Sequence, residues 1–387
     1  MVPLGELTAP AGFKAGKDTN HQVYSVTKHA GFVPSAEYFK KQIFSRELGG
    51  YKRVRSGDFA YATIHLDEGS IGIAPADGLI SPMYTVFRPE ETLVDPSYLL
   101  RFMKSPAALA QYPRFGKGSV HRRKSISLDA LSKLMVPLPP LDEQRRIAAV
   151  LDHADDLRTK QRGLIAKLDH LTRAIFEAVF SSGPTSPRWP IVRLGDVVPT
   201  IDSGSSPVCE NREASDGEWG VLKLGAISYG VFNPEENKAF LGDPASVRKV
   251  EVEPGDLLFS RKNTKELVGA TAVAYESPPL LLLPDLIFRL NIDRERVDAE
   301  YLHALLRSPR TRPAVVALAS GSASSMSNIS KARLVELPIE LPPIDLQHAY
   351  SDRVRTVNSL RDHASRVIVK LDDLFASLQS RAFSGQL

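Results

Sequence analysis

The chain has 387 residues, and its 49 Lys and Arg against 45 Asp and Glu give a formal net charge of +4. This length exceeds one ordinary hydrophobic core and suits two domains of roughly 140 residues with connecting segments. The single cysteine, Cys209, excludes an internal disulfide and a zinc site built from several cysteines. No apolar run approaches the roughly 20 residues of a membrane span, so we expect a cytoplasmic protein.

The second half of the chain repeats the first half. Residues 94–180 recur at a constant offset of 203, so that Val94 matches Val297. Each copy contains a Leu-Pro-Pro turn, at residues 138–140 and 341–343. The chain therefore holds two related domains, each followed by a similar C-terminal segment.

The region before each Leu-Pro-Pro turn predicts a mixed α+β domain, because short alternating runs are separated by Gly, Pro and Ser. Asp95 and Ser127 are expected to cap two short helices. The strands expected in copy one are residues 22–27, 58–64 and 83–88, and its helices are residues 95–104 and 127–133. The strands expected in copy two are residues 220–224, 256–260, 270–275 and 286–291.

A long helix is predicted over residues 142–180, directly after the first Leu-Pro-Pro turn. Apolar residues recur there at alternating steps of three and four, which is typical of a coiled-coil seam, and the last segment of the chain repeats the pattern. Such stripes can also pack on a nearby globular core, but two matched stripes favour packing on each other. The predicted seam comprises Ile147, Val150, Leu157, Leu164, Leu168 and Leu171 in the first helix and Val357, Leu360, Val367, Leu371, Leu374 and Leu378 in the second.

Connectivity predicts the direction of the two helices. Because the linker before the second domain is short, the second helix has to run back beside the first, which makes the pair antiparallel. Each helix would be roughly 58 Å long at 1.5 Å per residue, enough to place the domains a DNA turn of about 34–36 Å or more apart. The expected boundaries are 1–140 for the first domain, 141–182 for the first helix, 183–189 for the linker, 190–342 for the second domain and 343–387 for the second helix.

A basic segment in copy one favours contact with nucleic acid. Residues 96–128 contain no acidic residue, and the glycine-containing stretch 114–124 is strongly basic. Its side chains can neutralise phosphates or bond to guanine, although an exposed solubilising loop is the alternative. The residues assigned to DNA binding here are Arg114, Lys117, Ser119, His121, Arg122, Arg123 and Lys124.

The corresponding loop of copy two, residues 319–328, carries no charge and offers hydroxyls and an amide. An amide such as that of Asn328 can read adenine, although a plain polar turn is the alternative. Because the two copies differ here, we expect them to read two unlike half-sites. The residues assigned to DNA binding in copy two are Arg261, Lys262, Asn263, Thr264, Ser322, Ser324, Ser325, Ser327 and Asn328.

These features resemble the specificity subunit of type I restriction–modification enzymes over the whole chain. The most specific marks are the Val-Pro-Leu-Pro-Pro-Leu-Asp-Glu-Gln segment at 136–144 with the helix after it, and the Gly-Asp pairs at 57–58 and 255–256. The resemblance implies an α+β fold. It would contain two tandem α/β target-recognition domains, separated by two long antiparallel coiled-coil helices with pseudo-twofold symmetry.

The resemblance also implies a function. Each domain would grip one half of an asymmetric, bipartite site on double-stranded DNA, and the helices would seat two modification (methyltransferase) subunits. Those partners would bind S-adenosylmethionine and methylate adenine N6 with the base flipped out, and restriction/translocase subunits using ATP and Mg would join for cleavage. No cofactor is expected in this chain. By position, the resemblance adds Lys28, His29 and Lys223 to the DNA-binding residues.

The sequence contains little chemistry of its own. It has no G-x-x-x-x-G-K-[ST] or G-x-G-x-x-G loop and no H-E-x-x-H motif, and Asn233-Pro234 is not followed by an aromatic residue. We therefore expect no catalytic residue, no metal site and no enzyme activity in the isolated chain. The alternatives are a specificity subunit for a fused methyltransferase–nuclease, a coiled-coil scaffold without DNA binding, and a self-contained nuclease or methyltransferase.

Overall fold

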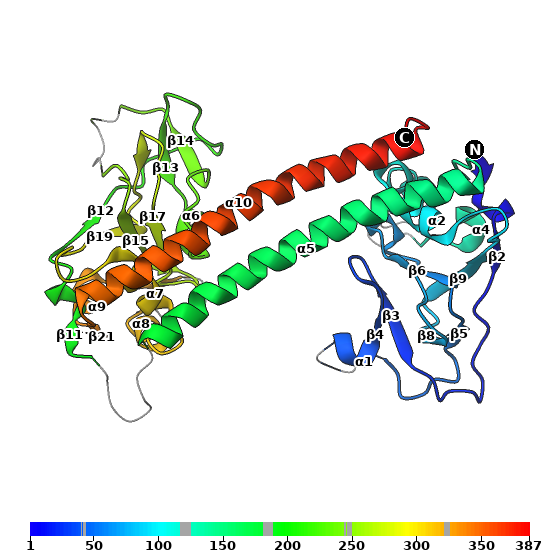
Figure 1. Ribbon diagram of the computed structural model, residues 1–387, viewed down its shortest axis with the longest axis horizontal. Helices are drawn as coiled ribbons and strands as arrows, with labels where there is room; N and C mark the ends of the chain where they lie inside the picture. The colour runs from blue at the N-terminus through cyan, green and yellow to red at the C-terminus, as the bar shows by residue number, and fades with distance from the viewer. Residues whose placement is uncertain are drawn as a thin grey trace. The chain divides into compact units, whose positions relative to one another are not determined.

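The computed structural model describes residues 1–39, 41, 44–116, 125–180, 189–243, 245, 250–320 and 326–387 (Figure 1). The chain divides into two compact units. Unit 1 comprises residues 1–163 and 364–387, and unit 2 comprises residues 164–363. Each unit contains one mixed domain and a part of each long helix, α5 (Leu141–Phe180) and α10 (Ile344–Phe383).

Unit 1 is built on two four-stranded sheets. One has the order β2-β9-β6-β7 and is antiparallel, and the other has the order β4-β3-β8-β5, in which β3 and β8 are parallel. A further pair joins β1 to β10. The bounds are β1 Val2–Pro3, β2 Thr8–Pro10, β3 Val23–Thr27, β4 Gly31–Pro34, β5 Lys52–Val54, β6 Phe59–Ala62, β7 Ile71–Ile73, β8 Gly78–Ile80, β9 Tyr84–Pro89 and β10 Met135–Val136.

The short helices of unit 1 begin where the sequence places their caps. The Asp95 carboxylate accepts from the backbone N–H of Tyr98, and the Ser127 hydroxyl accepts from that of Ala130. Both helices predicted in copy one are thereby confirmed. The helices are η1 Leu4–Glu6, α1 Ser35–Tyr38, η2 Leu66–Glu68, α2 Pro96–Met103, α3 Pro106–Leu109, η3 Tyr112–Arg114 and α4 Leu128–Leu131.

Unit 2 repeats this strand order among its described residues, except that its second sheet has three strands and no strand that corresponds to β5. Its sheets are β12-β19-β15-β17 and β14-β13-β18, with β13 and β18 parallel, and two further pairs join β11 to β21 and β16 to β20. The strands are β11 Ile191–Arg193, β12 Thr200–Ser203, β13 Trp219–Leu222, β14 Asn237–Phe240, β15 Asp256–Ser260, β16 Lys262–Asn263, β17 Thr271–Ala274, β18 Leu281–Leu282, β19 Ile287–Asn291, β20 Ser327–Asn328 and β21 Pro338–Glu340. The helices are η5 Leu194–Asp196, α6 Gly225–Ser228, α7 Ala299–Arg307, α8 Arg312–Ala317 and α9 Lys331–Leu334.

The Gly-Asp pairs show how closely the two copies agree. Gly57 and Gly255 have φ of +86° and +88°, a left-handed conformation that glycine adopts without strain. The following aspartates then each accept from a backbone N–H three residues earlier, at 2.7 Å for Asp58 and 2.9 Å for Asp256. Both carboxylates also pair with an arginine, on β9 and β19 respectively. The two copies therefore share hydrogen bonds as well as sequence.

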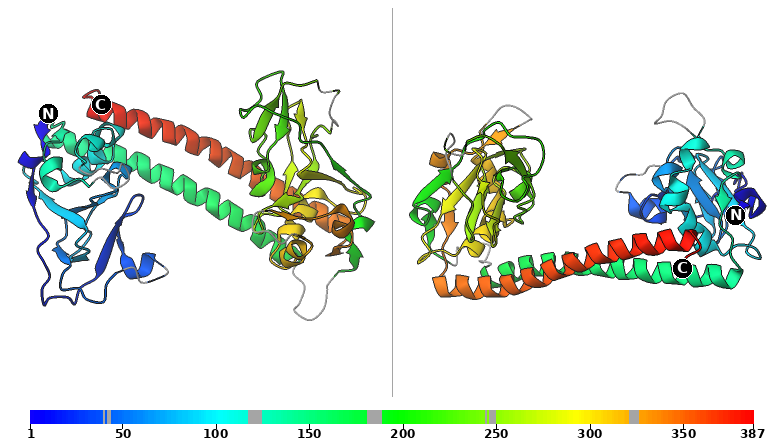
Figure 2. Two further views of the ribbon diagram at one scale, coloured as in Figure 1. Left: turned by 180° about the vertical axis from the view of Figure 1, so that it is seen from behind. Right: turned by 90° about the horizontal axis from the view of Figure 1, so that it is seen from above.

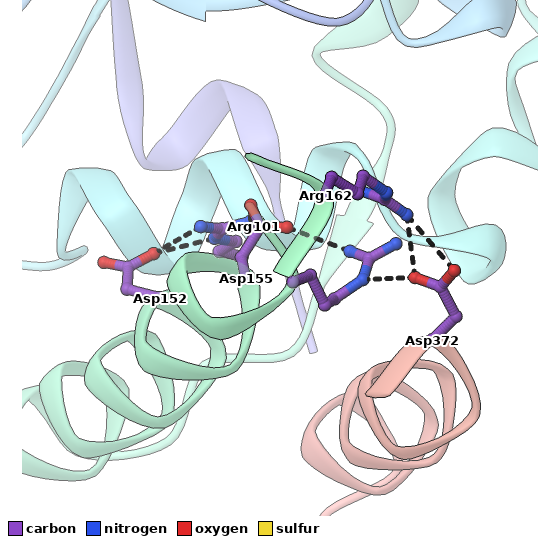
Figure 3. Close-up of polar contacts among 6 residues, drawn as sticks. Arg101, Asp152, Asp155, Arg162 and Asp372 are labelled. Carbon is purple, nitrogen blue, oxygen red and sulfur yellow. Dashed lines mark hydrogen bonds and ion pairs between the residues drawn. The ribbon is translucent and has the colours of Figure 1, made fainter. Parts of the chain in front are cut away.

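Within each unit the two long helices run antiparallel. In unit 1, Arg146 of α5 donates to the carbonyl oxygen of Leu387, while Arg158 donates to Asp372, earlier in α10, at 2.6 Å. Arg162 of α5 also bonds to Asp372 (Figure 3). In unit 2, Phe180 contacts the ring of Tyr350. Figure 2 shows from two further sides that the start of α10 packs on the mixed domain of unit 2, and that its end packs on the mixed domain of unit 1. The predicted antiparallel pairing is confirmed within each unit.

The structure corrects the predicted seam at five positions. Ile147, Leu168 and Val357 are buried, and Val150, Val367, Leu371 and Leu378 are half-buried. Five predicted seam leucines are instead between 38% and 55% exposed, namely Leu157, Leu164, Leu171, Leu360 and Leu374. The residue that follows each of these leucines is half-buried. Every second position of the seam therefore lies one residue further along the helix than predicted.

At Leu157 and Leu360 the shift has a physical cause in the arginine that follows each leucine. The Arg158 guanidinium lies 4.3 Å from the ring centroid of Phe375 and also bonds to Asp372, so its long stem fills a seam position. Arg361 takes the equivalent place in unit 2, with its side chain 19% exposed and close to Asp169. At these two positions a count of apolar residues passes over the arginine and selects the leucine before it.

Candidate nucleic-acid interface

In unit 2, two predicted DNA-binding segments come together as a pair of strands. Lys262 of β16 pairs with Asn328 of β20, and Asn263 pairs with Ser327. These segments lie more than 60 residues apart in the sequence, and nothing in their composition required them to meet. The pairing places a basic segment beside the predicted base-reading amide.

Arg261 is held in a defined orientation directly before β16. Its Nε lies 3.3 Å from Oδ1 of Asn328, its Nη1 lies 3.5 Å from the carbonyl oxygen of Asp285, and its guanidinium lies 5.2 Å from the ring centroid of Phe288. A planar guanidinium fixed on an aromatic face presents its remaining donors without a large loss of rotamer freedom. Arg261 is therefore preorganised together with the amide of Asn328.

The side chain of Asn263 points into the unit, where it is only 7% exposed. Its Nδ2 donates to the hydroxyls of Ser228 and Ser260 at 3.2 and 3.4 Å, and its Oδ1 accepts from the backbone N–H of Thr264. These partners occupy the amide within the domain. We therefore assign Asn263 to positioning β16, and Thr264 remains exposed.

Lys223 follows β13 and pairs with Glu236 at 3.1 Å, where both side chains are partly exposed. This ion pair leaves the ammonium group accessible to solvent. Its role in DNA binding stays a prediction. Ser322, Ser324 and Ser325 lie outside the residues that the structure describes.

In unit 1, Lys28 and His29 are exposed on the turn between β3 and β4, and Arg114 is exposed at the end of η3. The structure places them on separate connections. The other residues predicted for copy one lie outside the described part of the chain, namely Lys117, Ser119, His121, Arg122, Arg123 and Lys124.

A hydrogen bond common to both units identifies a segment that sequence reasoning missed. The backbone N–H of Ile126 donates to the carbonyl oxygen of Thr63 at 2.9 Å, and that of Ile329 donates to the carbonyl oxygen of Arg261 at 2.8 Å. Residues 63–65 of unit 1 thus occupy the place of Arg261 and β16. Extending the offset of 198 from the Gly-Asp pairs reaches the same assignment.

This segment of unit 1 borders a cavity of about 260 Å³. The cavity lies between β3, β9 and residues 62–65, and tyrosine and hydroxyl side chains contribute much of its lining. Its lining includes Tyr24, Ser25, Tyr51, Thr63, His65 and Tyr84. The two units therefore present unlike surfaces at equivalent places, one hollow and aromatic and the other basic.

In the part of the chain that the structure describes, no group of three or more His, Cys, Asp or Glu side chains could hold a metal ion. No helix among the described residues combines the length and the apolarity that crossing a membrane requires.

Comparisons with known proteins show which proteins the chain resembles. The sequence profile of the type I restriction modification DNA specificity domain matches residues 53–170. The chain is 31% identical over 160 residues to the type I restriction enzyme EcoEI specificity subunit of Escherichia coli, a match that covers 41% of this chain and 27% of that subunit. It is 24% identical to the MjaVIII specificity subunit of Methanocaldococcus jannaschii, over 73% of this chain and 68% of the relative. The chain therefore matches a type I DNA specificity domain over residues 53–170 and is similar to type I specificity subunits.

Solved structures agree with this resemblance at the level of the fold. The type I restriction–modification S subunit of M. genitalium superimposes with a TM-score of 0.63 over 98% of this chain and 95% of that chain, at 12% sequence identity. A chain from a study of complex assembly and conformational transition in a type I restriction–modification system gives a TM-score of 0.54 at 20% identity, over 100% and 97%. The predicted fold class, with two mixed domains and long coiled-coil helices, is confirmed for this chain.

Proposed function

We propose that this chain is the DNA-reading subunit of a type I modification and restriction enzyme. Each unit reads one half of an asymmetric, bipartite site on double-stranded DNA, and the complex works in the cytoplasm. Backbone phosphates hold each unit, a few polar side chains select bases, and the long helices set the gap between the half-sites.

One observation carries this proposal: the two units hold unlike residues on one hydrogen-bonded framework. Arg261 and Lys262 in unit 2 stand where unit 1 has Thr63 and Ile64, although the same backbone hydrogen bond fixes both segments. A scaffold for protein partners alone does not require this difference. Two readers of different half-sites do, because discrimination between bases depends on side-chain donors and acceptors.

The exposed leucines of the long helices support the proposed protein partners. Leu157 and Leu374 are exposed in unit 1, and Leu164, Leu171 and Leu360 are exposed in unit 2. Leucines exposed at heptad spacing are suited to helical partners. The proposal assigns one methyltransferase subunit to each set. Those subunits supply S-adenosylmethionine and the chemistry at adenine N6, and restriction/translocase subunits supply ATP- and Mg-dependent cleavage.

Methylome sequencing tests the proposal. Cells that contain the methyltransferase subunits would be sequenced with and without this chain. The expected result is adenine methylation at a bipartite, asymmetric sequence only when the chain is present. Methylation that does not depend on the chain, together with a purified complex that retards no duplex, would contradict the proposal and favour a scaffold.

A second arm separates recognition from catalysis. The pure chain would be incubated with the identified duplex, magnesium and S-adenosylmethionine. The proposal expects neither methylation nor cleavage until a methyltransferase subunit is added. Product formed by the pure chain would identify a self-contained enzyme instead.

A further inference from the structure

A short connection in unit 2 presents an exposed aromatic side chain. It joins β13 to β14, contains α6, and continues through residues 229–231 (Figure 1). Tyr229 is 77% exposed and Val231 is 46% exposed. The connection corresponds to the β3–β4 turn of unit 1, because β3 and β13 each pair antiparallel with the next strand and parallel with β8 or β18. That turn carries Lys28 and His29.

A guanidinium from α7 lies against the connection. Arg307 Nη1 is 3.4 Å from the carbonyl oxygen of Gly230, and Nη2 is 3.5 Å from that of Tyr229. Gly230 has a φ of +82°, and a Cβ built there would lie 2.0 Å from Arg307 Cζ. Glycine suits the left-handed backbone conformation, and a side chain at this position would displace the end of the Arg307 side chain. The buried His303, 3.1 Å from Arg307 Nη1, contacts the same group within α7.

The connection is also bonded to the strand that carries the predicted reading residues. Ser228, the last residue of α6, accepts a hydrogen bond from Asn263 of β16. The neighbour of Asn263 is Lys262, which pairs with Asn328. Tyr229 is thus one residue from a hydrogen bond that reaches β16, and the exposed Arg307 adds a positive charge that suits a polyanion.

We propose that residues 228–231 are a further DNA-contact element, in which the Tyr229 ring packs on the sugar and base edges of duplex DNA. This inference rests on the proposed function. The ring offers an apolar face with a polar tip, so its contact adds affinity without adding charge. Arg307 is a positioning residue that holds the backbone of the turn.

The test uses the full chain with its methyltransferase subunits and a duplex carrying the site found by methylome sequencing. Tyr229→Ala is expected to bind this duplex about tenfold more weakly, because the burial of the apolar ring face is lost. The slope of log affinity against log salt should not change, because no phosphate contact is lost. The matched control is Tyr275→Ala, an exposed tyrosine of the same unit whose hydroxyl lies 3.4 Å from Asn358 of α10. Equal affinities of the two variants would overturn the inference.

Two glycine variants test the contact between Arg307 and the backbone of residues 229–230. Gly217 has the same φ of +82° as Gly230, but a Cβ built on it meets no atom within 4 Å. Both alanine variants accept the same backbone strain, and only Gly230→Ala displaces Arg307. Gly230→Ala should therefore weaken specific binding while Gly217→Ala binds like wild type. An equal effect of both changes would show that backbone strain, and not the displacement of Arg307, weakens binding.

The outcomes separate this inference from the proposed function. A wild-type complex that retards no duplex would contradict the proposed function itself. A wild-type complex that binds its site while Tyr229→Ala binds equally well would contradict this inference alone. If Tyr229→Ala loses its methyltransferase subunits but retains DNA affinity, the turn is a protein contact and the inference is wrong.

Discussion

Gln144 and Gln347 make the same three hydrogen bonds in the two units. The amide oxygen of each accepts from a backbone N–H at 2.9 Å, of Asp95 and Asp298 respectively. The amide nitrogen of each donates to two backbone carbonyl oxygens, at 2.8 and 3.2 Å. Both side chains are fully buried at the start of a long helix. One glutamine in each unit thus joins the helix to the domain.

Removal of this joint should destabilise the chain. Gln347→Ala leaves one donor and two carbonyl groups of the backbone without their partners, which we expect to lower the free energy of unfolding by about 2–4 kcal/mol. Urea denaturation followed by circular dichroism measures this. Gln386→Ala, at an exposed glutamine, is the matched control and should change stability little. A loss below about 0.5 kcal/mol for Gln347→Ala would show that the joint is dispensable.

Stability should depend on pH through Glu300. Burial raises the pKa of this carboxyl to about 7 from 4.5, and nearby arginines, Arg355 first, oppose the rise. The folded state therefore holds the proton more tightly than the unfolded state. The contribution to stability is fully present below pH 4.5 and is lost as the pH rises through 7, by about 3 kcal/mol in total. We expect Glu300→Gln to be more stable than wild type at pH 8.

The difference between Glu300→Gln and wild type isolates this effect from His303. Burial lowers the pKa of His303 to about 3, so that residue destabilises the fold as the pH falls below 6.5. Subtracting the two unfolding curves at each pH cancels that contribution to first order. A difference that stays constant between pH 5 and 8 would contradict the raised pKa of Glu300.

Leu164 and Leu168 distinguish the observed seam from the predicted one. Both lie on α5 in unit 2, but Leu164 is 44% exposed and Leu168 is 8% exposed. Leu168→Ala should cost about 2–3 kcal/mol of unfolding free energy, and Leu164→Ala less than about 0.5 kcal/mol. Under the proposed function, Leu164→Ala should reduce co-purification of the methyltransferase subunit. Similar stability losses in both variants would restore the predicted register.

The ion pair between Arg158 and Asp372 should add modestly to helix pairing in unit 1. Arg162 also bonds to Asp372, at 2.8 Å, but the carboxylate is partly exposed and screened by solvent. Asp372→Asn should therefore cost about 1 kcal/mol or less, and the cost should shrink as salt is added. Asp373→Asn, at the exposed neighbouring aspartate, is the control. A cost that does not respond to salt would point to packing rather than charge.

Local signals made the elements of the fold predictable. Asp95 and Ser127 are short polar residues that cap helices in any context, and the strand predicted at residues 256–260 agrees with β15. The seam was only partly predictable, because Leu157 and Arg158 compete for one position. The outcome depends on Phe375 and Asp372, which lie more than 200 residues away in the chain.

The candidate site was less accessible from the sequence. The pairing of Lys262 with Asn328 is a long-range contact, so the sequence marked both segments but could not join them. The sequence also marked Asn263 as a DNA-binding residue, but its polar side chain is buried and forms hydrogen bonds within the domain. Composition identifies groups able to bind DNA, but the fold decides which of them face outward.

Lys262 and Asn328, paired across β16 and β20, should have separable roles in binding DNA. A lysine that contacts a phosphate contributes to every duplex, whereas an amide that reads a base contributes only at its own position. Lys262→Ala should weaken the methyltransferase complex on specific and unrelated duplexes alike, and reduce the salt slope by about 0.9. Asn328→Ala should cost about 1–3 kcal/mol on the specific duplex alone and leave the salt slope unchanged. Competition titrations at several salt concentrations measure both quantities. If Asn328→Ala weakened binding to all duplexes equally, the amide would act by orienting Arg261 and not by reading a base.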